Sequence, residues 1–157
     1  MEARYLNPFI LATQEVFNSM LGIGLTLFKP QLKTEKTSSS SVTGVLGFAG
    51  DKKGNIALSM GERAVCTAYQ KMTGEWPDSM GPEVIDAVGE LTNIISGQAR
   101  KQLDDVDLHL TATIPIVVRG EGVNINFITK TPIISLSFTF SMGSGQKEIV
   151  YLDVSLE

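Results

Sequence analysis

Two segments of the sequence carry the same four residue types at the same spacing, 75 positions apart. When the residues from Leu11 to Gly22 are aligned with those from Asp86 to Gly97, the matches are Ala12 with Ala87, Glu15 with Glu90, Asn18 with Asn93, and Gly22 with Gly97. Both segments have a helical pattern and both precede pairs of expected strands. Such self-similarity is typical of a duplicated unit. We therefore expect a pseudo-twofold repeat, in which each copy is a helix followed by a hairpin.

The remaining sequence alternates between helix and strand patterns. The first helix is expected from Pro8 to Leu21, with Asn7 as its N-cap and Pro8 at the first helical position. Further helices are expected at Glu62–Met72 and Pro82–Leu103. The expected strands are Leu25–Phe28, a hairpin of Val42–Phe48 and Asn55–Met60, and a four-strand meander of Leu110–Val118, Val123–Lys130, Ile133–Phe140 and Glu148–Val154, with Thr34–Ser41 as a polar loop. This order predicts an α+β fold with the helices on one face of a mostly antiparallel sheet.

The composition limits the functions that such a chain can have. At 157 residues we expect one domain over residues 1–157. A net charge of −4 makes nucleic-acid binding a poor candidate, because that binding requires clustered Lys and Arg. No apolar run approaches the length of a membrane helix and the first residues lack a signal-peptide pattern, so we expect no membrane contact. The single cysteine, Cys66, excludes an intrachain disulfide and fits a cytoplasmic location.

Common catalytic machinery is also missing from the sequence. His109 is the only histidine, which excludes multi-histidine metal sites and leaves one possible base for a Ser-His or Cys-His relay. No Walker loop and no Gly-x-Gly-x-x-Gly motif after a strand is present. We expect no metal site and no cofactor of the chain's own.

A helical wheel divides each copy of the repeat into two faces. In the second copy, the apolar stripe expected to pack on the sheet is Val84, Val88, Leu91, Ile95 and Ala99, and the opposite face is Asp86, Glu90, Asn93, Gly97 and Arg100. In the first copy, the residues expected to face inward are Phe9, Val16 and Met20, and those expected to face outward are Glu15, Asn18 and Gly22, with Leu11 at the position of Asp86.

Two glycines inside the second helix indicate a use for its outer face. Gly89 and Gly97 are expected towards the outer side, and each costs about 1 kcal/mol relative to alanine in a helix interior. A face that admits another backbone closely has a use for glycine, whereas a merely solvated face has none. We therefore expect a partner-docking surface around the Glu-x-x-Asn pair, composed of Asp86, Gly89, Gly97 and Arg100 around Glu90 and Asn93. The alternative is that the Glu and Asn are ordinary surface residues.

The residues from Asp86 to Gly97, Asp-Ala-Val-Gly-Glu-Leu-Thr-Asn-Ile-Ile-Ser-Gly, resemble the signature helix of the CheC/CheX/FliY phosphatases of bacterial chemotaxis. The resemblance covers nearly the whole chain, and its other parts are Asn7–Ile10 with Val16, Phe17 and Met20, then Gly44–Gly50, Gly54–Ser59, Ala68–Gly74 and Pro115–Gly120. The length of the chain looks most like that of CheX-type members.

The resemblance implies a CheC-like fold and a phosphatase that dephosphorylates an aspartate of a CheY-type response regulator. It implies that Asn93 orients the attacking water and that Glu90 pairs with a lysine of the regulator. The required Mg²⁺ is expected to be held by the regulator and not by this chain. This division is physically coherent, because phosphoryl transfer needs positioning and charge neutralisation more than a protein nucleophile. The resemblance also implies a homodimer.

Three alternatives stay open at this point. Glu15 and Asn18 form either a second working site or a vestigial or accidental match, because CheX-type members use only the later helix. The uncharged Ile133–Phe140 strand is either an edge that a dimer covers or a central strand. The function is either that of the phosphatase, or that of a non-catalytic module that docks on a receiver domain or flagellar switch component, or that of a sensor for a small ligand.

Overall fold

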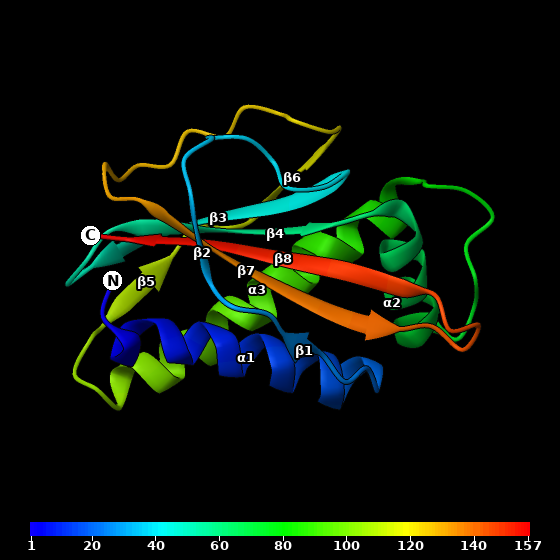
Figure 1. Ribbon diagram of the computed structural model, residues 1–157, viewed down its shortest axis with the longest axis horizontal. Helices are drawn as coiled ribbons and strands as arrows, with labels where there is room; N and C mark the ends of the chain where they lie inside the picture. Colours follow the sequence, from blue (N-terminus) through cyan, green and yellow to red (C-terminus); the bar gives the residue numbers. More distant parts are fainter.

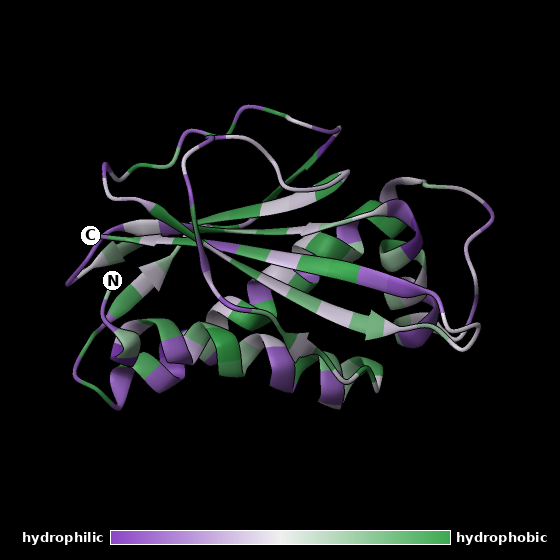
Figure 2. Cartoon of the chain, in the orientation of Figure 1, coloured by the Kyte–Doolittle hydropathy of each residue, from purple (hydrophilic) through white to green (hydrophobic).

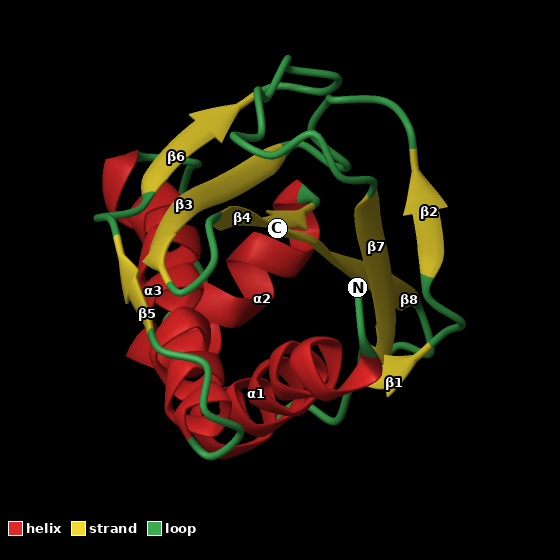
Figure 3. Ribbon diagram, turned by 90° about the vertical axis from the view of Figure 1, so that its left-hand side faces the viewer, coloured by secondary structure: helices red, strands yellow, loops and turns green.

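The computed structural model describes residues 1–157 and places three helices on one face of an eight-stranded antiparallel sheet (Figure 1). The helices are α1 (Ala3–Leu21), α2 (Glu62–Thr73) and α3 (Pro82–Asp104). The strands are β1 (Thr26–Leu27), β2 (Gln31–Lys33), β3 (Val42–Gly50), β4 (Gly54–Met60), β5 (Leu110–Ala112), β6 (Ile116–Arg119), β7 (Ile133–Ser141) and β8 (Lys147–Leu156). Viewed end-on, the sheet curves around the helices (Figure 3). The predicted α+β class is confirmed.

The strand order of the sheet is symmetric with respect to the two halves of the chain. The sheet runs β1-β7-β8-β4-β3-β5, and β2 also pairs with β7 while β6 also pairs with β3. Exchanging β1 with β5, β2 with β6, β3 with β7 and β4 with β8 therefore returns the same sheet. The two hairpins meet where β4 pairs with β8 in the centre. The predicted pseudo-twofold repeat is thus confirmed, and it relates α1 to α3.

Helix α1 begins five residues earlier than the sequence predicts. Its N-cap is Glu2, so Asn7 is not the cap, and Pro8 lies inside the helix and not at its first position. Proline there removes one backbone hydrogen bond. The extra turn compensates by packing Tyr5 and Leu6 against the core, and Pro8 itself is buried.

The predicted four-strand meander is wrong. Leu110–Val118 is interrupted at Thr113–Pro115, and its two pieces, β5 and β6, both pair with β3. Val123–Lys130 forms no strand, although every second residue from Ile125 onward is buried. That alternation arises because Ile125 and Phe127 pack with Ala57 and Ile133 in a small second cluster. The segment therefore covers the sheet without joining it.

Strand β7 is central and not an edge. It pairs with β8 on one side and with β1 and β2 on the other, so its backbone groups need no second copy of the chain. The alternative of a central strand is the correct one for Ile133–Phe140, and this strand gives no support to a dimer.

The main core fills the space between the sheet and the helices and comprises 30 buried apolar residues. Figure 2 shows polar residues recurring at intervals along α1, as expected of a helix with one exposed face. No helix of the chain is long and apolar enough to cross a membrane.

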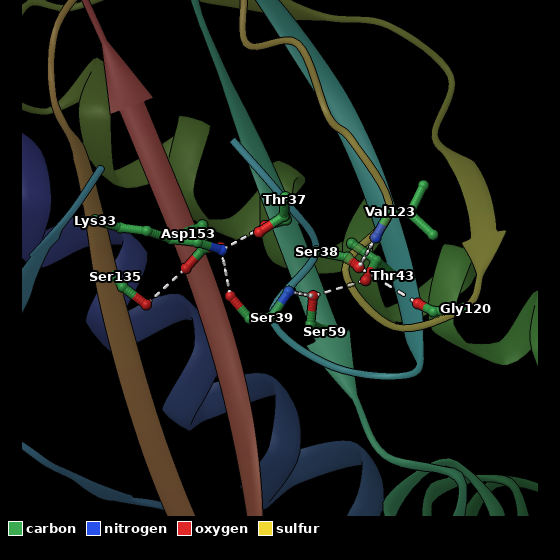
Figure 4. Close-up of polar contacts among 10 residues, drawn as sticks. All are labelled: Lys33, Thr37, Ser38, Ser39, Thr43, Ser59, Gly120, Val123, Ser135 and Asp153. Carbon is green, nitrogen blue, oxygen red and sulfur yellow. Dashed lines mark hydrogen bonds and ion pairs between the residues drawn. The ribbon is translucent and has the colours of Figure 1, made fainter. Parts of the chain in front are cut away.

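A polar network covers the opposite face of the sheet (Figure 4). The Lys33 Nζ lies 2.7 Å from the Asp153 Oδ2, and the side chains of the two residues are 13% and 2% exposed. The Ser39 hydroxyl donates to the same carboxylate oxygen and the Ser135 hydroxyl donates to the other. Lys33 also donates to the carbonyl of Thr37. These contacts hold the polar loop after β2 over β8.

Candidate functional site

Helix α3 lies at the centre of the helical layer. It begins after Gly81 with Pro82 in its first turn, where the missing N–H of proline costs nothing. The whole predicted apolar stripe is buried, namely Val84, Val88, Leu91, Ile95 and Ala99. The helix packs directly on β3, because a Cβ at Gly44 would overlap the Thr92 hydroxyl and lie 3.3 Å from the Val88 carbonyl oxygen. The backbone that carries the predicted site is therefore fixed by the core.

The outer face of α3 presents the predicted polar residues to solvent. Asp86, Glu90 and Asn93 are all exposed. Residues three and four apart on a helix are neighbours, so the Glu90 and Asn93 side chains lie side by side. Glu90 takes part in none of the five ion pairs of the chain. A carboxylate and a carboxamide are thus both free to contact a partner.

The two glycines of α3 have different surroundings. Gly89 is buried, and a Cβ there would lie 2.9 Å from the Val117 Cγ2 of β6. The prediction that Gly89 belongs to the docking surface is therefore wrong, because this glycine admits β6 and not a partner. Gly97 is half-buried, and a Cβ there would meet nothing within 4 Å. Only Gly97 leaves open space beside Asn93.

Arg100 lies two turns beyond Asn93 and is half-buried. Its Nε is buried without a hydrogen-bond partner, and the residue forms no ion pair. The outer face of α3 therefore changes from acidic residues near its start to a basic one towards its end.

The related face of α1 is also exposed. Glu15 and Asn18 point to solvent, as predicted, and so does Leu11. Met20 is 38% exposed, so its predicted inward orientation is wrong. The helix ends at Leu21, as expected, one residue after Met20.

No nucleophile or metal cluster accompanies the Glu90 and Asn93 pair. Burial and the nearby Glu62 carboxylate raise the pKa of the Cys66 thiol, which disfavours the reactive thiolate. His109 pairs with Asp104, eleven residues beyond Asn93 on the same helix, or roughly 16 Å along its axis. No group of three His, Cys, Asp or Glu side chains is placed to hold a metal ion. The chemistry available on this face is hydrogen bonding and charge.

The fold and the exposed helix define a CheC-like protein. A CheC-like superfamily protein from Shewanella sp. PV-4 has the same fold, with a TM-score of 0.85 and 30% identity over 100% of this chain and 99% of that one. More narrowly, the chain belongs to the family of the chemotaxis phosphatase CheX, whose family model matches residues 42–139.

Two relatives within this family are informative. The CheY-P phosphatase CheX of Thermotoga maritima is 28% identical over 137 residues, which are 85% of this chain and 88% of the relative. A structure of a CheX–CheY–BeF₃–Mg²⁺ complex from Borrelia burgdorferi matches with a TM-score of 0.74 and 26% identity, over 98% of this chain and 97% of that one. The matched residues 42–139 include all of α3, whereas α1 lies outside them.

Sequence reasoning did not identify the partners of two residues. Val117, the neighbour of Gly89, was not recognised because a helical wheel shows faces and not what packs on them. The special role of Asp153 could have been predicted, because it is an acidic residue within the apolar strand pattern of β8. Its partner Lys33 is 120 positions away and could not be inferred from spacing.

Proposed function

We propose that this chain hydrolyses the aspartyl phosphate of a CheY-type response regulator. The observation that carries the proposal is the free Glu90 and Asn93 pair on the outer face of a helix fixed by the core. The names of the relatives from Thermotoga maritima and Borrelia burgdorferi support the choice of substrate. The Mg²⁺ belongs to the regulator in this proposal, and the chain contributes side chains alone.

Asn93 is proposed to orient the attacking water. Its carboxamide oxygen accepts a hydrogen bond from the water while its NH₂ group donates to a phosphoryl oxygen, and neither task requires a change of protonation. The hydrolysis is faster because the water is already held in line with the phosphorus before the transition state is reached. An uncharged amide also avoids repulsion with the phosphoryl group, which a carboxylate in the same place would suffer.

Glu90 is proposed to bind a basic group of the regulator. It lies one turn before Asn93, about 4.5 Å along the axis, so that one partner surface reaches both side chains. Asp86 extends the acidic area, and Arg100 offers a positive charge on the other side of Asn93. This charge order favours one orientation of the partner, because reversing it would bring like charges together.

The proposal is tested by the rate of loss of phosphate from the phosphorylated regulator in Mg²⁺ buffer. We expect wild type to accelerate hydrolysis and Asn93→Ala to lower the acceleration by roughly 100-fold, in line with the loss of one preorganised polar group. Asn126→Ala is a matched control, because Asn126 is exposed but lies in the segment that covers the opposite face of the sheet. Binding of the regulator without acceleration by wild type would instead establish a non-catalytic docking module.

We also propose that the chain acts as a single domain over residues 1–157 and as a homodimer in the cytoplasm. One core of 30 residues shared by both halves of the sheet supports the single domain. Sedimentation equilibrium tests the dimer, and a constant mass of about one chain at micromolar concentration would exclude it.

A further inference from the structure

Arg100 is the one basic residue among those that form the outer face of α3. It lies one turn beyond Gly97 and seven positions beyond Asn93, which is roughly 10 Å along the helix axis. Side chains on a helix lean towards its N-terminus, and an arginine side chain is long enough to cover most of that distance. The guanidinium group is therefore within reach of an anion that is bound beside Asn93.

No acidic group of the chain holds the Arg100 guanidinium. Its Nε is buried without a hydrogen-bond partner, and the residue takes part in no ion pair. Asp104 is four positions further along α3, the spacing at which ion pairs form on a helix, but its Oδ1 lies 2.8 Å from the Nδ1 of His109 instead. A buried charged donor without an acceptor is unfavourable, so an anion brought by a partner would relieve a cost that the free protein carries.

The surface between Arg100 and Asn93 is open. Gly97 lies between them on the outer face, it is half-buried, and a Cβ there would meet nothing within 4 Å. Any side chain at this position would stand between the carboxamide and the guanidinium. Glycine therefore leaves room for one small group to contact both residues at once.

A phosphoryl group is the ligand whose chemistry fits this arrangement. It carries negative charge on its non-bridging oxygens, and the planar N–H fork of a guanidinium matches two of them. Arginine is not deprotonated in proteins, so the contact does not depend on pH. The acidic residues at the other end of the face, Asp86 and Glu90, would repel the same group, which leaves Arg100 as the positive charge of this face that attracts it.

From these observations we propose that Arg100 contacts the phosphoryl group of the docked regulator, and that this contact makes the chain prefer the phosphorylated form. The inference rests on the proposed function and deepens it. During hydrolysis the water oxygen forms a bond to phosphorus and the bond from phosphorus to the aspartate oxygen breaks. The products are the free carboxylate and inorganic phosphate, and the proton lost by the water passes to a phosphate oxygen. Arg100 exchanges no proton and stabilises the charge on the non-bridging oxygens.

A contact of Arg100 with a carboxylate of the regulator would lead to a different expectation. The regulator holds Mg²⁺ in the proposed function, and Mg²⁺ is bound through carboxylates together with phosphate oxygens, so acidic side chains of the regulator lie near the same place. A carboxylate is present in both forms of the regulator, whereas the phosphoryl group is present in one form alone. The dependence of the affinity on phosphorylation therefore distinguishes the two contacts.

The test measures the dissociation constant of the regulator in Mg²⁺ buffer, with and without BeF₃, which stands in for the phosphoryl group on the aspartate. The ratio of the two constants is the selectivity for the activated form. We expect Arg100→Gln to lower this selectivity by roughly 10- to 100-fold, because one hydrogen-bonded charge pair is lost, and to leave the affinity for the inactive form nearly unchanged. Lys130→Gln is the matched control, since it removes the same charge from an exposed residue in the segment that covers the opposite face of the sheet, and it should keep the selectivity of wild type.

Arg100→Lys is a second variant, which keeps the long apolar stem and the charge but loses the planar fork. We expect it to lower the selectivity, by less than Arg100→Gln does. It carries the test if Arg100→Gln does not fold, and a selectivity equal to that of wild type would then overturn the role of the guanidinium fork.

Two outcomes with Arg100→Gln overturn the inference. Equal weakening of both forms would show that Arg100 binds a carboxylate of the regulator, and unchanged binding of both forms would show that the residue lies outside the contact. The proposed function fails separately, because the acceleration of hydrolysis is measured on wild type alone. Its absence would remove the phosphatase activity, whatever the selectivity of binding is.

Discussion

Replacing Gly97 by alanine should stabilise the fold. The glycine lies inside α3, where alanine is favoured over glycine by about 1 kcal/mol. A Cβ there would meet nothing within 4 Å, so no steric cost opposes this gain. For a domain of this size, 1 kcal/mol corresponds to a rise in Tm of about 2–4 °C. A chain that needed only stability would have no use for glycine at this position.

The same substitution should weaken the contact with the regulator. Gly97 lies one turn beyond Asn93 on the outer face, where the proposed partner must approach the helix closely. An added methyl group in a well-packed contact costs about 1–3 kcal/mol, which is roughly 5- to 150-fold in affinity. Stability and docking should therefore move in opposite directions. A purely structural role of Gly97 cannot produce that pair of changes.

Two assays decide the matter. Thermal and denaturant unfolding give the change in stability, and titration of the regulator activated with BeF₃ and Mg²⁺ gives the dissociation constant. Asn126→Ala is the control, since Asn126 is exposed in the segment that covers the opposite face of the sheet and should alter neither quantity strongly. Gly97→Ala with unchanged affinity would refute the docking argument. A fall in the Tm of Gly97→Ala would refute the inference that a methyl group at this position meets no steric obstacle.

Three further changes test the interior and the electrostatics. Lys33→Met or Asp153→Leu alone should each lower the free energy of unfolding in denaturant by about 3–5 kcal/mol, because each leaves a buried charge unpaired. The double variant should lower it by less than either single variant, and additive losses would contradict this expectation. Gly44→Ala should destabilise the fold by about 1–3 kcal/mol, since its Cβ would overlap a hydroxyl of α3. The Asp104 carboxylate raises the pKa of His109 above 6.5, so the stability gained from this pair is full below pH 6.5 and is lost as the pH rises through the raised pKa; Asp104→Asn should lower that pKa in an NMR titration.

Helix α3 was predictable because its signals are local. Pro82 marks its first turn, and an uninterrupted apolar stripe reaches Leu103, so the expected end falls within one residue of the observed one. The start of α1 was not predictable in the same way, because Pro8 is a strong start signal that packing overrides. The turn before it is retained by the burial of Tyr5 and Leu6, which only the assembled core reveals.

The errors in the second half and on the helix faces have one physical origin. Period-two burial in Val123–Lys130 reports that one side of the segment is covered, and it does not report strand pairing. In the same way, a wheel places Gly89 away from the apolar stripe, but it does not show that β6 crosses there. Met20 has the reverse problem, since the wheel groups it with the inward residues although its side chain is 38% exposed. Local periodicity indicates which residues share a face, whereas the identity of the neighbour depends on contacts distant in sequence.

The pseudo-twofold symmetry of the sheet does not extend to the packing of the two helices that it relates. Helix α3 packs against α1, α2 and strands β3, β4, β5 and β6, whereas α1 packs chiefly against α3 and α2. An element held by more neighbouring elements opens less readily than one held by fewer. Positioning a water molecule gains most when the positioning group has little freedom of its own, since a displacement of about 1 Å can cost a factor of 100 in rate. The Glu-x-x-Asn motif on α3 therefore stands on the more firmly packed of the two helices, and the copy on α1 stands on the one with fewer packing partners.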